Sequence, residues 1–188
     1  YVQENGVLLI TGNGGETASR VLLACGAHSA KLTAALTGKQ VPLDTERGYH
    51  LMLPHEHDRL PFPVTSLERK FIMTPMRDGL RLAGTVEFAG LERPANMARA
   101  WQLQRLSQGL FRKDLNADGA TPWMGFRPSL PDSLPVIDQV CAGKVLLAFG
   151  HQHLGLTQAA VTAEMIGQMV SGAAGELPNA DAYQLARF

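Results

Sequence analysis

The sequence of 188 residues predicts an α+β fold in which an antiparallel sheet is flanked by helices. Between residues 41 and 86, short β-prone runs follow one another through tight turns and not through crossover helices. Apolar residues recur at helical spacing in three other stretches, 29–36, 96–113 and 156–170. The composition is 45% hydrophobic and 18% charged, which is typical of a packed domain, and we expect one compact body.

The amino-terminal part predicts a hairpin of two strands, Val7–Thr11 and Ser19–Ala24, around the turn residues 12–16. A dinucleotide-binding glycine loop needs a strand before it and a helix after it, whereas Glu16-Thr17-Ala18 lead into another strand. The glycine cluster therefore favours a turn. The second strand ends at Cys25-Gly26-Ala27, and a short helix is expected over 29–36.

The middle of the chain predicts the sheet, with extended runs over 41–53, 62–66, 70–75 and 80–86. Asp78-Gly79 is a strong hairpin signal between the last two runs. One long helix is expected over 96–113, where the apolar residues form a stripe that favours a core contact over a cofactor contact. The stripe consists of Met97, Ala100, Trp101, Leu103, Leu106 and Leu110.

The carboxy-terminal part predicts a turn at Gly125-Phe126-Arg127-Pro128 and a buried strand over 144–149. The segment Gly150-His151-Gln152-His153-Leu154-Gly155 then opens an apolar helix over 156–170, which Ser171-Gly172 ends.

Charge and composition exclude several classes of function. Lysine plus arginine and aspartate plus glutamate are both 17, so no basic surface for nucleic acid is expected. No apolar run approaches a membrane span and no secretory signal opens the chain, which favours a cytoplasmic protein. Cys25 and Cys141 lack metal-ligand spacing and are expected to be buried, reduced thiols. Neither histidine pair, 55/57 or 151/153, has a third ligand at convincing spacing, so no metal is expected. The first residue is Tyr1, which suggests a cut or processed chain.

Four segments in this order resemble the D-amino-acid oxidase superfamily of FAD-dependent oxidoreductases, and the D-amino-acid dehydrogenase branch most of all. They are Leu22–Ser29, with His28 where an aromatic residue is frequent; Val41-Pro42-Leu43 with Arg47-Gly48-Tyr49-His50; Gly125–Pro128 with Pro131-Asp132 and Leu134–Ile137; and Gly150-His151 with Gly155 and Thr157. The resemblance covers nearly the whole chain up to about Gly172.

The resemblance implies a two-domain flavoenzyme of which this chain is the carboxy-terminal portion. Residues 1–40 would end the FAD-binding portion, 41–128 would form the substrate-binding antiparallel sheet, and 129–188 would return to the FAD-binding portion. The strand 19–26 and the helix 155–171 would be the remnants of the flavin domain. No G-x-G-x-x-G occurs in the sequence, so the implied partner is a missing amino-terminal FAD-binding segment.

The implied reaction, in amino-acid catabolism, is oxidation of a D-amino acid or related amine to an imine and keto acid, with a quinone or other carrier as electron acceptor. Arg127 would hold the substrate carboxylate, since a guanidinium offers it two parallel hydrogen bonds. Pairing of Arg127 with a carboxylate such as Asp132 is the alternative. Tyr49 and His50 lie on opposite faces of a strand, so at most one faces substrate; Tyr49 is preferred, with an ordinary core tyrosine equally open.

The resemblance also implies non-covalent FAD, because no cysteine stands in the 125–128 segment where the monomeric sarcosine oxidase branch tethers its flavin. The expected cofactor-binding residues are Ala24, Gly26, Gly150, His151, Leu154, Gly155, Leu156 and Thr157, with backbone amides at the helix start as the donors. The alternative is a flavin-free orphan domain or accessory subunit that binds a small carboxylate or a partner protein. Peripheral attachment to the inner face of the membrane is left open.

Overall fold

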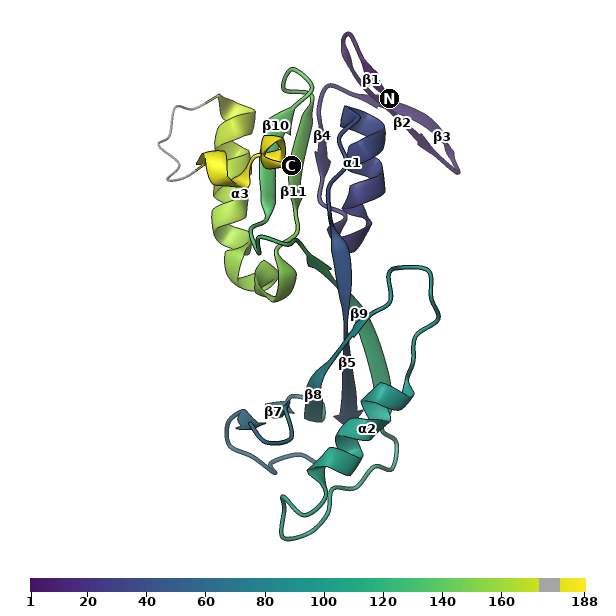
Figure 1. Cartoon of the computed structure of the whole chain (residues 1–188), viewed down its shortest axis with the longest axis vertical. Helices are drawn as coiled ribbons and strands as arrows, with labels where there is room; N and C mark the ends of the chain where they lie inside the picture. Colours follow the sequence, from purple (N-terminus) through teal and green to yellow (C-terminus); the bar gives the residue numbers. More distant parts are fainter. Residues whose placement is uncertain (173–179) are drawn as a thin grey trace. The chain divides into compact units, whose positions relative to one another are not determined.

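A computed structural model describes residues 1–172 and 180–188 (Figure 1). The chain forms two compact units and not the single body expected from its composition. Unit 1 consists of Tyr1–Thr45 and Arg127–Phe188, and unit 2 consists of Glu46–Phe126. The α+β fold class is confirmed, since antiparallel strands dominate and few helices flank them.

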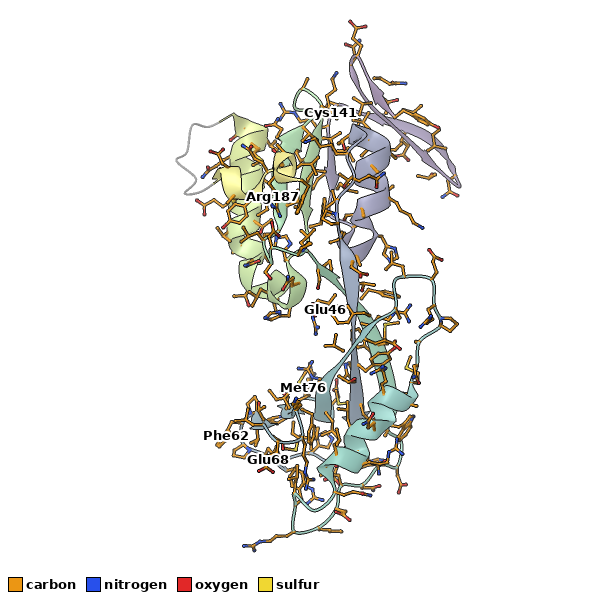
Figure 2. The ribbon with its side chains drawn as sticks, viewed as in Figure 1. Glu46, Phe62, Glu68, Met76, Cys141 and Arg187 are labelled. Carbon is orange, nitrogen blue, oxygen red and sulfur yellow. The ribbon has the colours of Figure 1, made fainter. Side chains whose placement is uncertain are left out.

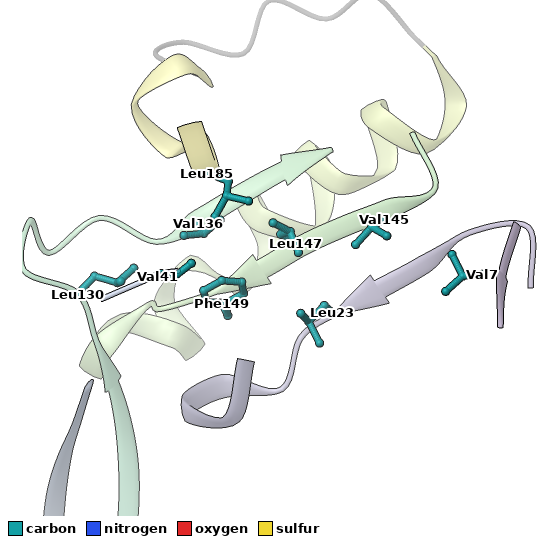
Figure 3. Packing of buried hydrophobic residues seen from close by; sticks show 9 residues of the cluster. All are labelled: Val7, Leu23, Val41, Leu130, Val136, Val145, Leu147, Phe149 and Leu185. Atoms are coloured by element: carbon teal, nitrogen blue, oxygen red, sulfur yellow. The ribbon is translucent and has the colours of Figure 1, made fainter. Parts of the chain in front are cut away.

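Unit 1 is built on the sheet β10-β11-β4, formed by β10 (Val136–Val140), β11 (Val145–Phe149) and β4 (Val21–Leu23). β10 and β11 are antiparallel, whereas β11 and β4 are parallel, with Val145 opposite Val21. The core against this sheet is shown in Figure 3 and comprises Val7, Leu23, Val41, Leu130, Val136, Val145, Leu147, Phe149 and Leu185.

Two regular helices accompany this sheet. α1 (Ser29–Thr37) follows the 3₁₀ turn η1 (Gly26–His28) and packs against β4, while α3 (Gly155–Ser171) follows η2 (Gln152–Leu154) and packs against β10 and β11 (Figure 1). Both helices were predicted and are confirmed. Two 3₁₀ turns, η3 (Ala180–Tyr183) and η4 (Leu185–Arg187), lie against β10. Of the helices described, none is both long and apolar enough to cross a bilayer.

The predicted amino-terminal hairpin is wrong in its second strand. β2 (Gly6–Thr11) pairs with β3 (Gly14–Ala18) around Gly12-Asn13, and β1 (Val2–Gln3) adds a third strand. The run expected to close the hairpin instead supplies β4, because pairing beside β11 buries Leu23 to 5% exposure. β3 is exposed along most of its length and forms through backbone pairing with β2, so the hydrophobicity of the sequence does not reveal it.

Unit 2 is organised around the sheet β6-β7-β8-β5-β9. Its strands are β5 (Asp44–Leu53), β6 (Val64–Ser66), β7 (Phe71–Met76), β8 (Gly79–Phe88) and β9 (Thr121–Ser129), of which β5 and β9 reach across the unit boundary. One face packs on α2 (Ala98–Ser107) through the buried residues Leu51, Leu53, Leu80, Leu82 and Leu103. We call this the covered face and the opposite side the open face.

Three predictions in these regions need correction. The long helix ends at Ser107 and not near 113, because Gln108 is extended and Gly109 takes a φ of +73°. Gly125–Pro128 lies within β9 and not in a turn; β9 is an edge strand, where prolines are tolerated because part of the backbone needs no ladder partner. Cys25, expected to be buried, is exposed, although both cysteines are free thiols as expected.

Candidate functional site

The carboxyl ends of β4 and β11 lie side by side in unit 1, because the two strands are parallel neighbours. Ligands of α/β sheets bind at such carboxyl ends, beside the helix that follows. A groove of about 560 Å³ runs from these ends along α3. It is lined by Leu22, Ala24, Ala148, His151, Gly155, Ala159, Thr162, Ala163, Ile166, Gly167 and Val170.

The structure therefore brings together three of the expected cofactor residues, Ala24, His151 and Gly155, along one groove. Small side chains predominate there, which leaves room for a flat group against the backbone. Leu154 and Leu156 are 41% and 94% exposed at the start of α3, an apolar surface that a bound group or another segment would cover. Gly26, Gly150 and Thr157 stand in the adjoining turns and first helical turn.

Gly150 makes the turn from β11 to η2 possible. Its φ is +84°, and a Cβ at this position would approach Leu130 Cδ1 to 2.5 Å. A side chain would therefore be strained in both its backbone and its packing. This explains in physical terms why glycine precedes His151.

His151 is half-buried, and its Nε2 lies 2.9 Å from the Thr162 hydroxyl of α3. Burial lowers the pKa of this imidazole from its ordinary value of 6.5. The unfolded chain therefore binds a proton at His151 more readily than the folded protein does. Above the ordinary pKa of 6.5 this difference has no effect on stability, but as the pH falls below that value the folded protein loses stability.

Acidification should consequently loosen α3. Between pH of about 7.5 and about 5.5, we expect amide exchange in the α3 peptides to accelerate more in the wild type than in His151→Gln, which has no proton to take up. Exchange corrected for its intrinsic pH dependence and read by mass spectrometry measures this. His153→Gln at the exposed neighbour is the control and should retain the wild-type response. An identical response in His151→Gln would contradict the assignment.

Arg47 is the centre of a polar network on the covered face of unit 2. It is 0% exposed, and its guanidinium donates to the carbonyls of four loop residues: Ala89 (3.3 Å), Gly90 (2.8 Å), Arg93 (2.6 Å) and Pro94 (3.2 Å). It also lies 3.8 Å from the Glu87 carboxylate and over the Phe126 ring. In the sequence, Arg47 stood out only as part of the Arg47-Gly48-Tyr49-His50 motif. The signal that could have identified it is a charged residue in register with Tyr49, Leu51 and Leu53, the alternate positions of β5 that are buried.

Tyr49 belongs to the same network. It is 2% exposed, its hydroxyl donates to Glu87 Oε2 at 2.5 Å, and the Asn96 backbone N–H donates to it at 3.1 Å. This hydrogen bond, together with Arg99 and Arg47, lowers the pKa of the Glu87 carboxyl. The hydroxyl is thus already engaged on the covered face, which favours the core-tyrosine alternative over contact with substrate.

Replacement of Tyr49 by phenylalanine separates these two roles. The Asn96 N–H loses its acceptor and the network loses a donor, so unfolding of unit 2 should become easier by about 1–2 kcal/mol. Both tryptophans, Trp101 and Trp123, lie in unit 2, so urea unfolding followed by tryptophan fluorescence reports this unit. Unchanged stability with impaired substrate binding would instead favour the substrate role.

His50 lies on the open face and stacks on Trp123 of β9, with ring centroids 4.7 Å apart and planes 17° apart. Burial, followed by the charge of Arg81, lowers the pKa of His50. A Cβ at Gly125 would overlap the Trp123 ring, which explains the glycine of the Gly-Phe-Arg-Pro segment. Of the Tyr49 and His50 pair, His50 therefore has the side chain suited to meet a ligand.

Arg127 is half-buried in β9. The carboxylate suggested as its alternative partner, Asp132, is paired with Arg187 at 2.7 Å, and Arg187 is labelled in Figure 2. Arg127 is not among the residues that line the groove along α3.

A family of known proteins matches almost the whole chain. The family model described as "FAD dependent oxidoreductase" matches residues 2–169. This chain belongs to the FAD-dependent oxidoreductase family. A D-amino-acid oxidase of Bradyrhizobium diazoefficiens is 38% identical over 176 residues, which are 92% of this chain and 42% of that protein. A D-amino acid dehydrogenase of Paramagnetospirillum magneticum is 32% identical and covers 87% and 39% of the two chains.

Solved structures show the same fold. The glycine oxidase of Geobacillus kaustophilus matches with a TM-score of 0.77 at 22% identity, over 98% of this chain and 50% of that one. The iminodiacetate oxidase of Chelativorans matches with a TM-score of 0.73 at 24% identity, over 98% and 51%. This FAD-dependent oxidoreductase chain thus spans about 40–50% of the length of the relatives named above.

Proposed function

We propose that this chain is the substrate-side, carboxy-terminal portion of an enzyme that oxidises the amine of a D-amino acid or a related amine to an imine, which water hydrolyses to the keto acid. The observation that carries the proposal is the groove bounded by the carboxyl ends of β4 and β11 and by α3. FAD, when bound, would accept the hydride. The electron acceptor that follows would be a quinone or another carrier, in a cytoplasmic enzyme that could attach peripherally to the inner face of the membrane.

Unit 1 would hold the flavin without a covalent bond. The residues proposed to contact it are Ala24, Gly26, Gly150, His151, Leu154, Gly155, Leu156 and Thr157. The small residues of the groove and the exposed apolar side chains at the start of α3 support this fit. A glycine-rich pyrophosphate loop is absent from the 188 residues, so a companion FAD-binding segment would supply those contacts.

The strands β5 and β9 would orient the substrate, whose carboxylate Arg127 of β9 would bind through two parallel hydrogen bonds. Fixing the carboxylate leaves the α carbon in one orientation, which is the main requirement for hydride departure. His50 and Trp123 would supply a flat wall on the open face. Tyr49 would act through the network that holds β5, since its hydroxyl is occupied by Glu87 and Asn96.

The decisive experiment fuses this chain, in one polypeptide, to the amino-terminal region of one of its D-amino-acid oxidase or dehydrogenase relatives. A yellow protein whose blue absorbance bleaches anaerobically with D-amino acids, but not with their L enantiomers, is the expected result. Oxygen consumption compared with dye reduction then distinguishes an oxidase from a dehydrogenase. A colourless protein that still binds a small carboxylate would favour the flavin-free accessory role instead.

A further inference from the structure

Arg81 occupies an unusual place on the open face of unit 2. It stands on β8, the middle strand of the five, with Met52 of β5 on one side and Thr74 of β7 on the other. Its side chain is half-buried, and its Nε is buried without a hydrogen-bond partner. A buried donor with no acceptor is costly and calls for an explanation, such as a ligand.

The neighbours of Arg81 on this face supply no counter-charge. Met52 offers a thioether and Thr74 a hydroxyl, and no carboxylate within the described residues forms an ion pair with Arg81. This contrasts with the covered face of the same sheet, where Arg47 and Arg99 both face Glu87. Among the described residues, Arg47 of the sheet and Arg99 of α2 thus have an acidic partner on the covered face, whereas Arg81 has none on the open face.

The aromatic pair His50 and Trp123 lies beside this charge. His50 is opposite Ala83, two residues from Arg81 along β8, which puts His50 and Arg81 in diagonal positions on the same face. The influence of the Arg81 charge on the His50 pKa agrees with this proximity. A flat aromatic surface next to an unpaired guanidinium is suited to a short chain that ends in a carboxylate.

We propose that Arg81 is a specificity-determining residue that binds a second carboxylate of the substrate, so that the preferred substrates are amino acids or amines with an acidic side chain. The inference rests on the proposed function, in which Arg127 takes the first carboxylate. The His50 and Trp123 rings form the wall along which the side chain of the substrate extends. The second carboxylate would bind the part of the half-buried Arg81 guanidinium that remains accessible.

The first test uses the chain itself and needs no flavin. In a Trp101→Phe background Trp123 is the sole tryptophan, and its fluorescence reports the open face directly. Titration with glutarate should change the emission at concentrations at least about 10-fold lower than with glutaramate, its uncharged-end analogue. Arg81→Gln should abolish this difference and Arg81→Lys should restore part of it. Arg77→Gln, at an exposed arginine in the turn of the same hairpin, should not alter it.

The second test uses the flavin-loaded enzyme. The ratio of kcat/KM for D-glutamate to that for D-glutamine should favour the acid and should fall about 10–100-fold in Arg81→Gln. If D-amino acids reduce the flavin but the ratio is the same in both proteins, the Arg81 inference fails while the proposed function stands. If no amino acid reduces the flavin, the proposed function fails and the glutarate titration alone decides, with equal binding by wild type and Arg81→Gln overturning the inference.

Discussion

Arg47→Met is expected to destabilise unit 2 by about 3–5 kcal/mol, a large part of the stability of an ordinary domain. The side chain is 0% exposed and donates to the carbonyls of residues 89, 90, 93 and 94. Methionine fills much of the volume but donates nothing, so those carbonyls and the Glu87 carboxylate lose their buried partner. The loop 89–97 should detach before the sheet itself melts.

Urea unfolding followed by tryptophan fluorescence measures this effect, since both tryptophans report unit 2. The midpoint should fall sharply in Arg47→Met, and amide exchange should rise first in peptides covering 89–97. Arg77→Met is the matched control, because that arginine is exposed, and it should stay within about 0.5 kcal/mol of the wild type. A shift equally small in Arg47→Met would show that the loop is held by other contacts.

The helices and most strands could be predicted from local signals. α1 and α3 begin after glycine turns and end at glycines, and the pattern of apolar residues places them within about two residues. The β7–β8 hairpin likewise follows from Asp78-Gly79, which the pairing of Met76 with Gly79 places at the turn. Such features depend on residues near in sequence, which is why one sequence reveals them.

What the sequence could not reveal depends on distant partners. β4 pairs with β11 more than a hundred residues away, and only that contact separates it from the amino-terminal hairpin. The same holds for Arg47, whose carbonyl partners lie more than forty residues along the chain. Strand alternation correctly predicts that Tyr49 and His50 lie on opposite faces of the sheet. Which of the two faces α2 covers depends on contacts between distant segments and could not be predicted from the sequence.

Arg127→Ala is expected to produce the largest loss of activity in the flavin-loaded enzyme. A guanidinium that binds the substrate carboxylate contributes to both affinity and alignment, so kcat/KM for a D-amino acid should fall about 100-fold or more, with a higher KM and a lower kcat. Arg127→Lys keeps the charge but not the paired hydrogen-bond geometry, and should recover only part of the loss.

The matched substrate pair is a D-amino acid and its amide, which differ at the group that Arg127 would bind. The amide offers no carboxylate and should be oxidised more slowly than the acid by the wild type. Arg127→Ala should therefore reduce kcat/KM for the amide far less than kcat/KM for the acid. This difference between the two substrates assigns the contact even if the variant is less stable. Arg112→Ala, at an exposed arginine of unit 2, should leave both rates unchanged. Equal losses on acid and amide would make Arg127 a structural residue of β9, and the carboxylate would then need another anchor.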